Sequence, residues 1–351
     1  MSETPTQSVE AADRGVARRR VTIEDIAREA KVSIAAVSYA LNGRSGVGAE
    51  TRERIQAVAG RMGWRPNSTA RALSASRAHS VGLVLGNVVD AFGFASYFMR
   101  LVGGIEQVLS AAGMSLVLHV VNDQREEPSI YRRWSSERRV DGVIVGNLEA
   151  GDPRLSTLRE LDLPAVLVGP AGQPGFPSVW TDDEEAAQTA VRHLAELGHR
   201  RIARVGGPGR FRHTRIRREA FLAGARALGL PEPHSSESDY GRAEETTREL
   251  LRASEPPTAI VYEGDLMAVL AIGVAQRMGF TVPGDLSIVA WDDSPLCEIV
   301  QPHLTALRRD LQDYGIRVAS QLLAVIAGEA VGDLQGTTTE LIRRASTAPP
   351  R

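Results

Sequence analysis

Residues 20–64 contain three short stretches in which apolar and polar positions alternate with the spacing of amphipathic helices. The first begins after Thr22, whose hydroxyl can cap it, and an acid follows three positions later at Asp25. A second helix can begin after Ser33, and a third is expected over roughly 50–62. The positions expected to face inward are Ile23, Ile26, Ala27, Ala30, Val37, Leu41, Ile55, Val58, Ala59 and Met62. So few apolar residues make a tiny core, which suits a compact head better than an enzyme domain.

From Val81 onward the pattern changes to apolar runs of strand length separated by helical patterns. The runs occupy 81–86, 115–120, 141–146, 164–169, 201–207, 258–262 and 286–291. Continuous Val, Ile and Leu runs indicate strands covered on both faces, and their alternation with helices indicates parallel sheets. We expect two α/β lobes, with any ligand beyond the carboxyl ends of the strands.

The segments on either side of the three helices lack such a pattern. Residues 1–19 are polar and aperiodic, so we expect a disordered leader. Residues 65–78 can start a short helix capped by Asn67, yet Leu73 is its only large apolar residue. Such a helix should form only when a partner supplies contacts. The expected organisation is therefore a leader, a helical head over 20–64, a hinge over 65–78 and a larger domain over 79–347.

Composition narrows the class of protein. The chain has 351 residues, enough for two or three domains with sizeable cores. Its single cysteine, Cys297, excludes an intramolecular disulfide framework and any multi-cysteine metal site. The apolar pattern contains neither a signal peptide nor a membrane span. We expect a soluble, cytoplasmic protein without cofactor or metal.

The charges are unevenly distributed, although the formal net charge is only −2. Between Arg18 and Arg77 there are twelve basic and five acidic residues, a surplus of seven positive charges, so the remainder carries −9. This asymmetry is typical of a small module that lies on phosphates, joined to a larger one that does not. The alternative is a solvated helical surface.

Short motifs recur through both parts. In the head and hinge they are VTIEDIA at 21–27, VS at 32–33 and 37–38, LNG at 41–43, TRERI at 51–55 and RPN at 65–67. In the larger part they include GIE at 104–106, RVDGVI at 139–144, LGHRRI at 197–202, DLSIV at 285–289 and ELIR at 340–343. In this order and spacing, over about 20–347, the motifs closely resemble those of LacI/GalR-type bacterial repressors.

The resemblance implies a small all-α helix-turn-helix DNA-binding domain and an α/β two-lobed effector domain with parallel sheets, like type I periplasmic binding proteins. The N-lobe would cover about 79–181 and 309–336, and the C-lobe about 182–308 and 337–347. It also implies a homodimer on near-palindromic, double-stranded operator DNA. The function would be transcriptional repression, with operator affinity controlled by a small effector such as a sugar, and the protein would be nucleoid-associated when bound to DNA.

Two other classes share the α/β pattern. An enzyme would need a catalytic motif, and the sequence has no GxSxG elbow, no HExxH and no GxxxxGK[ST] loop. The turn GGPG at 206–209 lacks both GxGxxG spacing and a lysine. A periplasmic transport receptor would need a signal peptide and no basic head. We therefore expect a regulator and not an enzyme.

The resemblance places a recognition helix after Ser33, with Ile34, Ala35, Ala36 and Tyr39 toward the major groove. This helix lacks the Arg, Asn or Gln that read bases through two hydrogen bonds, so readout should depend on methyl contacts and one hydroxyl. Surface packing of Ile34 and Tyr39 is the alternative. The remaining candidates for DNA binding, at phosphates or in the minor groove, are Thr22, Ser33, Asn42, Thr51, Asn67, Ala70 and Leu73; the first three could equally serve only as caps.

Lys31 departs from the family pattern, in which many members have glycine between the residues corresponding to Ala30 and Val32. If this residue takes a positive φ, lysine costs about 1 kcal/mol there. The head should still fold.

Effector contacts are expected from Tyr97, Phe98, Arg217, Asp265 and Asp292. Arg217 matches a family arginine that hydrogen-bonds the effector, and its planar fork of donors suits hydroxyls, carboxylates or purine edges. Tyr97 and Phe98 match an aromatic pair at the cleft mouth, with core packing as the alternative. Asp265 and Asp292 follow expected strands, and capping of the next helix is the alternative for Asp265. Departures from the family pattern at Ala220, Glu263, Gly264 and Trp291 leave the effector's identity open.

Leu73→Ala should weaken operator binding more than about tenfold, because in the family this leucine wedges between base pairs and its burial in the bent duplex offsets the unstacking. Ala70 would lie against the groove floor. Effector affinity should not change. A gel-shift or fluorescence titration checks this, and unchanged operator affinity would refute the wedge.

Overall fold

The computed structural model describes residues 21–41, 45–64, 77–86, 94–238 and 240–351. The chain forms two compact units, Met1–Ser76 and Arg77–Arg351. The expected leader, most of the expected hinge and the candidates Asn42, Asn67, Ala70 and Leu73 lie outside the described residues.

The first unit contains the three expected helices, α1 (Ile23–Ala30), α2 (Ile34–Leu41) and α3 (Ala49–Arg61). Its buried core contains seven of the ten predicted inward positions together with Ala40. The other three, Ile23, Leu41 and Met62, are partly buried and pack against this core, as do Val21, Val32, Val47 and Trp64. Each helix alone is too short to be stable in water, so mutual burial of these few side chains holds the unit together.

Side chains start the first two helices as expected. The Thr22 hydroxyl accepts a hydrogen bond from the Asp25 backbone N–H, and Asp25 Oδ2 accepts one from the Thr22 N–H at 2.9 Å. Ser33 Oγ accepts from the Ala36 N–H at 3.1 Å. The third helix begins after Gly48, which provides no side-chain cap. Lys31 takes a left-handed conformation, with φ 54° and ψ 47°, so the condition under which lysine is costly at this position is met.

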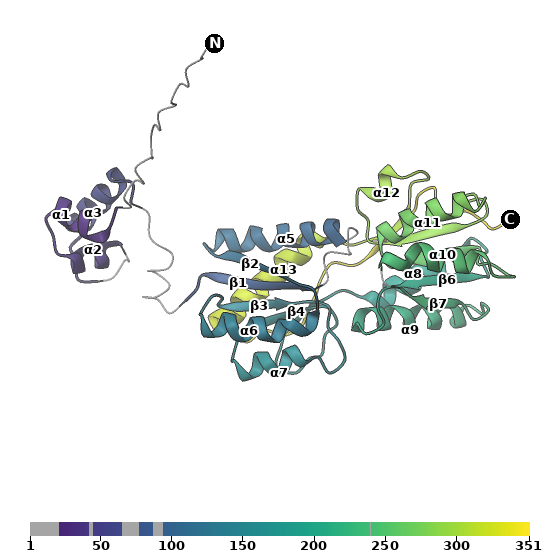
Figure 1. The fold of residues 1–351 in the computed structure, drawn as a ribbon, viewed down its shortest axis with the longest axis horizontal. Helices are drawn as coiled ribbons and strands as arrows, with labels where there is room; N and C mark the ends of the chain where they lie inside the picture. The colour runs from purple at the N-terminus through teal and green to yellow at the C-terminus, as the bar shows by residue number, and fades with distance from the viewer. Residues whose placement is uncertain (1–20, 42–44, 65–76, 87–93, 239) are drawn as a thin grey trace, which may run out of the picture. The chain divides into compact units, whose positions relative to one another are not determined.

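Two six-stranded sheets form the larger unit (Figure 1). The first, in the order β11-β5-β4-β3-β1-β2, is parallel throughout and contains β1 (Ser80–Gly86), β2 (Ser115–Val121), β3 (Gly142–Val145), β4 (Ala165–Val168), β5 (Ser178–Trp180) and β11 (Leu334–Gln335). The second, in the order β12-β10-β9-β8-β6-β7, contains β6 (Ile202–Gly206), β7 (His234–Glu237), β8 (Ala259–Tyr262), β9 (Ser287–Trp291), β10 (Thr305–Arg308) and β12 (Glu340–Ile342). Only β12 runs antiparallel to its neighbour in these sheets.

Helices cover both faces of each sheet. In the first lobe α5 (Phe94–Ala111) and α13 (Leu311–Ala327) pack on one face, and α6 (Glu127–Ser136) and α7 (Pro153–Glu160) on the other. In the second lobe α8 (Asp183–Glu196) and α9 (Arg212–Ala227) pack on one face, and α10 (Ala243–Leu251) and α11 (Asp265–Arg277) on the other. The short helices are η1 (Gln124–Glu126), η2 (Tyr240–Arg242) and α12 (Leu296–Ile299).

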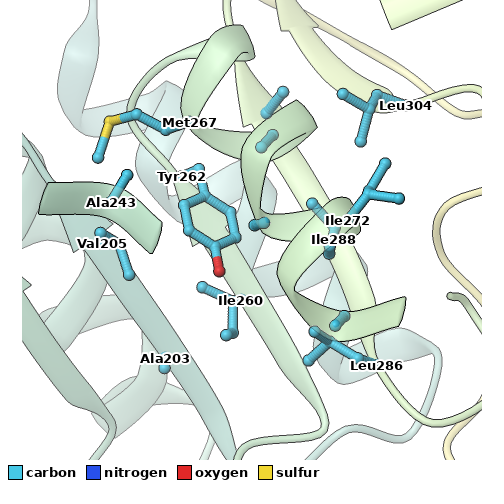
Figure 2. Packing of buried hydrophobic residues seen from close by; sticks show 14 of the residues in the cluster. Ala203, Val205, Ala243, Ile260, Tyr262, Met267, Ile272, Leu286, Ile288 and Leu304 are labelled. Atoms are coloured by element: carbon cyan, nitrogen blue, oxygen red, sulfur yellow. The ribbon is translucent and has the colours of Figure 1, made fainter. Parts of the chain in front are cut away.

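The core between the second sheet and helices α10 and α11 shows how such a lobe is filled (Figure 2). Ile260 and Ile288 from adjacent strands meet Ile272 from α11, and all three are at most 2% exposed. The Tyr262 ring is also buried, and its hydroxyl is 2.9 Å from Thr247 Oγ1. Burial of the ring is favourable because its one polar atom has a hydrogen-bond partner.

All seven strands expected from the apolar runs are present, but one expectation about them is wrong. Strand β2 is the edge of its sheet, and Leu118 and Val120 are 48% and 53% exposed. It is therefore not covered on both faces. The apolar pattern shows which side chains can be buried, and the position of the strand in the sheet decides whether they are.

Helices α5 and α13 cross at a pair of glycines. A Cβ at Gly104 would lie 2.0 Å from the Gln312 carbonyl oxygen, and one at Gly315 would lie 2.2 Å from the Leu101 carbonyl oxygen. The two backbones therefore approach more closely than any other residue type would permit.

Gly104→Ala should destabilise the larger unit by about 1–3 kcal/mol or more, because the backbones must separate. The adjacent Gly103 is exposed on the same helix with nothing near its Cβ position. Gly103→Ala is therefore the matched control and should stabilise by about 0.5–1 kcal/mol. Chemical denaturation of both variants checks the contrast, and equal effects would contradict the close crossing.

Candidate functional site

A cavity of about 90 Å³ lies in the larger unit, where the carboxyl ends of strands from both sheets meet. Strand ends of the first sheet contribute Gly86, Gly146, Gly169 and Thr181, and those of the second contribute Glu263, Asp292 and Arg309. This is the edge at which parallel sheets bind ligands. The volume accommodates several water molecules and hence a small organic ligand.

Arg217 enters the cavity from the second turn of α9. Its Nη2 donates to Asp183 Oδ1 at 2.9 Å, and its guanidinium carbon lies 4.1 Å from the centre of the Trp291 ring. Its Nε is buried and has no partner among the described residues. The ion pair and the ring hold the guanidinium in place at the wall of the cavity.

Arg309 is a cavity residue that the sequence analysis missed. Its Nε donates to Asp292 Oδ1 at 2.8 Å, its Nη1 donates to Thr181 Oγ1 at 3.4 Å, and its guanidinium carbon lies 5.2 Å from the centre of the Tyr97 ring. The signal that could have found it is the short run 304–307 before two arginines, which forms β10.

Four of the five expected effector residues line the cavity. Tyr97 and Phe98 come from α5, with their rings edge to face at 5.4 Å, and burial raises the pKa of Tyr97. Asp292 lies at the end of β9 in a left-handed conformation, with φ 69°. Tyr97 and Asp292 therefore contact Arg309, and Phe98 packs against Tyr97, in one shared cavity.

Asp265 is not among the lining residues. Its carboxylate is 4% exposed at the first position of α11, where Oδ1 accepts from the Leu266 N–H at 2.7 Å. A hydrogen bond with Ser294 opposes the rise in the pKa of Asp265 that its burial causes. The N-cap residue of α11 is Gly264, and no side chain caps this helix, so Asp265 neither lines the cavity nor acts as the N-cap.

Glu263, which was singled out only as a departure from the family pattern, lines the cavity instead. It is buried, and Oε1 accepts from Arg204 Nε at 2.7 Å and also from Arg204 Nη2. Burial raises the pKa of Glu263, and the Arg204 guanidinium opposes that rise. Arg204 lies within β6, which the sequence predicts as an apolar run, so the sequence did not indicate that Arg204 pairs with Glu263.

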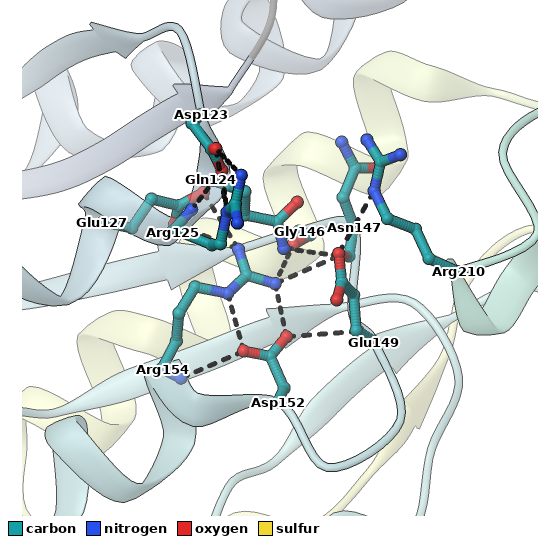
Figure 3. Close-up of polar contacts among 10 residues, drawn as sticks. All are labelled: Asp123, Gln124, Arg125, Glu127, Gly146, Asn147, Glu149, Asp152, Arg154 and Arg210. Carbon is teal, nitrogen blue, oxygen red and sulfur yellow. Dashed lines mark hydrogen bonds and ion pairs between the residues drawn. The ribbon is translucent and has the colours of Figure 1, made fainter. Parts of the chain in front are cut away.

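A second buried ion network supports the N-lobe side of the cavity (Figure 3). Arg154 pairs with Glu127 and Asp152, and its Nη2 donates to the carbonyl oxygens of Gly146 and Asn147 at 2.9 and 3.0 Å. Each buried charge is thereby paired, as burial requires. The network fixes the loop after β3, which forms one wall of the cavity.

Contacts also join the lobes beside this loop. The Arg212 backbone N–H donates to the Leu148 carbonyl oxygen at 2.8 Å. Arg210 Nε lies 3.3 Å from Glu149 Oε1, and this ion pair is drawn in Figure 3. On the other side of the cleft Arg100 Nη1 donates to the Asp293 carbonyl at 3.5 Å. The cavity is therefore bounded by contacts that a change in lobe angle would alter.

His213, in the first turn of α9, lines the cavity with its ring stacked on Phe211 at 5.6 Å. Burial, followed by the nearby charges of Arg217 and Arg309, holds the pKa of His213 well below its usual range. The imidazole is therefore neutral at physiological pH.

The helix expected to read DNA presents the side chains that were predicted for it. Ile34 and Tyr39 are 52% and 40% exposed, Ala35 is exposed and Ala36 is half-buried. The Tyr39 ring packs beside Gly46, where a Cβ would lie 3.3 Å from Cδ2. An isoleucine and a tyrosine at the surface of so small a unit leave apolar area available for a partner.

The candidates for phosphate contact are also accessible in the head. Thr22 and Ser33 are exposed although their oxygens cap helices, and Thr51 is half-buried in the first turn of α3. Their placement at helix N-termini suits binding of phosphate oxygens.

The part of the chain that the structure describes has neither a membrane-spanning helix nor a cluster of metal-binding side chains. No helix there is long and apolar enough to cross a membrane. Those residues also contain no group of three or more His, Cys, Asp or Glu side chains able to hold a metal ion.

Comparisons with known proteins place both units. The model of bacterial regulatory proteins of the lacI family matches residues 22–67, and that of a periplasmic binding protein-like domain matches residues 191–347. The chain is 32% identical over 310 residues to catabolite control protein A of Priestia megaterium, which covers 86% of this chain and 91% of that protein.

Solved structures agree with the expected fold. The CelR–cellobiose complex matches with a TM-score of 0.70 and 27% identity over 93% of this chain and all of the other. The Lac repressor dimer bound to operator and the anti-inducer ONPF matches with a TM-score of 0.82 and 25% identity over 94% of this chain and all of the other. The expected helical head and two α/β lobes are confirmed.

His213→Gln should reduce the loss of stability on acidification. An unfolded histidine takes up a proton near pH 6.5, whereas the buried one does not, so the neutral side chain contributes stability that is lost as the pH falls below about 6.5. Thermal melting at about pH 7.5 and about pH 5.5 should therefore give a smaller difference for the variant. His234→Gln, at an exposed position, controls for the loss of a histidine. Equal differences for His213→Gln and the parent protein would contradict a neutral His213.

Proposed function

Because the chain belongs to the LacI family of bacterial regulatory proteins, we propose that it represses transcription from an operator whose occupancy is controlled by a sugar or a related metabolite. Membership of the family makes it a DNA-binding transcriptional regulator with an effector-binding domain, and not an enzyme. The observation that carries the effector proposal is the cavity in which Arg217 keeps a buried, unpartnered donor among carboxylates and aromatic rings.

A sugar suits this lining. Ring hydroxyls both donate and accept hydrogen bonds, so they can satisfy Arg217 Nε together with carboxylate oxygens of Asp183 and Asp292. The apolar face of a sugar ring can lie on Tyr97 or Phe98. One relative of known structure, CelR, was solved as a complex with cellobiose, which supports a carbohydrate here.

Operator binding is assigned to the exposed side of α2 and to the hinge. Ile34, Ala35, Ala36 and Tyr39 would contact base edges, with the family leucine and alanine of the hinge in the minor groove. Without an arginine, asparagine or glutamine on α2, base specificity would come from apolar contacts and from the deformability of the operator.

A homodimer would bring two heads onto a near-palindromic site, which doubles the number of specific contacts. The related Lac repressor was solved as a dimer on its operator. In this chain Leu118 and Val120 on the edge strand β2, together with Met99 on the neighbouring α5, expose apolar side chains that a second copy can cover.

Coupling between the cavity and the head follows from the construction of the cavity. Its walls come from both lobes, so a ligand that touches both favours one lobe arrangement by the difference in its binding free energy. The chain crosses between the lobes near 181–182, 309–310 and 336–339. We propose that a change in lobe angle reaches the paired hinges, whose helices form or melt with DNA.

Arg217→Ala should lower effector affinity at least about tenfold, because it removes a buried charged donor, and should leave operator affinity unchanged. The effector is sought by a thermal-shift screen of sugars, sugar phosphates, nucleosides and purines on the full-length protein. Operator affinity is measured by fluorescence anisotropy on duplexes selected from a randomised pool, with and without the effector.

Arg215→Ala is the matched control, since Arg215 is exposed two positions earlier on α9. It should bind effector and operator as the parent protein does. An effector that binds the Arg217→Ala variant at full affinity would refute the assignment of this cavity as the effector site. Failure to select any duplex would refute the operator proposal.

A further inference from the structure

We propose that Glu263, fixed by Arg204, is a specificity-determining residue that makes the cavity select an uncharged, hydroxyl-bearing ligand and exclude its phosphorylated or otherwise anionic form. The inference rests on the proposed function, in which this cavity is the effector site. It concerns the charge state of the ligand, which that proposal leaves open.

The pair is built into two neighbouring strands. Arg204 lies on β6, and Glu263 directly follows β8, where Val205 stands opposite Tyr262 in the parallel register. Both side chains are buried, and two guanidinium N–H groups donate to Glu263 Oε1. A guanidinium so placed leaves the glutamate little freedom to rotate.

The surroundings of Arg204 are shaped to hold it. A Cβ at Gly206 would lie 2.3 Å from Arg204 Nη2, so only glycine leaves room for the guanidinium at this point of the strand. Arg204 Nη2 also donates to the Thr214 carbonyl at 3.1 Å, and Nη1 donates to Ser235 Oγ at 3.2 Å. The arginine is therefore a fixed support for Glu263, and Glu263 is the member of the pair that lines the cavity.

The two carboxylate oxygens of Glu263 differ in the hydrogen bonds that they accept. Oε1 receives both hydrogen bonds from Arg204, whereas Oε2 receives only a long one, 3.4 Å, from the Gly207 N–H. Oε2 therefore retains acceptor capacity, and Glu263 lines the cavity. Glu263 and the Arg217 guanidinium line the same cavity, and together they match a ligand bearing hydroxyls, which can donate to the carboxylate and accept from the guanidinium.

Charge balance excludes anions. Within the described lining, the guanidiniums of Arg217 and Arg309 are already paired with Asp183 and Asp292. Two further lining carboxylates, Glu263 and Glu127, are paired with arginines that do not line the cavity, Arg204 on β6 and Arg154 on α7. A phosphate would therefore meet carboxylates with no cation left over from these pairs, and repulsion between like charges is stronger in a partly buried cavity than in bulk water.

The test uses inorganic phosphate and glucose 6-phosphate as probes of anion binding to the full-length protein, by thermal shift and calorimetry. The parent protein should bind neither at millimolar concentration. Glu263→Gln should raise the affinity for both at least about tenfold, because it removes the negative charge and leaves the Arg204 guanidinium unneutralised. Glu263→Met removes the same charge by another side chain, so the test does not depend on the folding of one variant.

Glu263→Asp keeps the charge and is the matched control, which should bind neither anion. The proposal is overturned if the parent protein binds phosphate as tightly as the neutral variants, if neither neutral variant gains affinity, or if Glu263→Asp gains as much as they do. None of these measurements uses DNA. Failure to bind an operator would therefore count against the proposed function alone.

Discussion

The guanidinium of Arg309 contacts residues of both lobes of the larger unit. It belongs to a segment that crosses between the lobes, it pairs with Asp292 at the end of a C-lobe strand, and it lies over the Tyr97 ring from an N-lobe helix. A charge buried at such a place must be paired, and the ion pair with Asp292 holds Arg309 where it can contact both lobes. A ligand that displaces or completes these contacts acts on the lobe arrangement directly, which is the requirement for coupling the cavity to a distant head.

Parallel strands gather the residues at their carboxyl ends along one edge of each sheet. Because each strand of the two main sheets runs in the same direction as its neighbours, apart from β12, the loops that follow them gather at the carboxyl ends, and the two sheets bring these ends to a common cavity. Buried ion pairs and a close helix crossing support the cavity at this edge. Arg154 and Arg204 neutralise the buried carboxylates Glu127 and Glu263, and glycines at 104 and 315 let two helices pack closely beside it.

Almost all of the secondary structure and core of the head could be predicted from the sequence. Its caps and most of its inward positions follow from local hydrogen bonding and helical periodicity, which depend on residues close in the chain. The seven strands of the lobes were found for the same reason, since each is a continuous apolar run. The five strands that were missed, such as β5 and β11, are too short or too polar to form such a run, and they exist because a neighbouring strand offers hydrogen bonds.

The sequence by itself determined the class of fold, the division into a basic head and a two-lobed domain, and the family whose motifs carry Arg217 and Asp292. Tertiary structure alone decided which side chains share the cavity. It placed Arg309 beside Asp292, moved Asp265 out of the lining, and showed that Glu263 is held by an arginine 59 positions away in the chain. The physical reason is that periodicity and capping act over a few residues, whereas the pairing of buried charges is decided by which strands lie side by side.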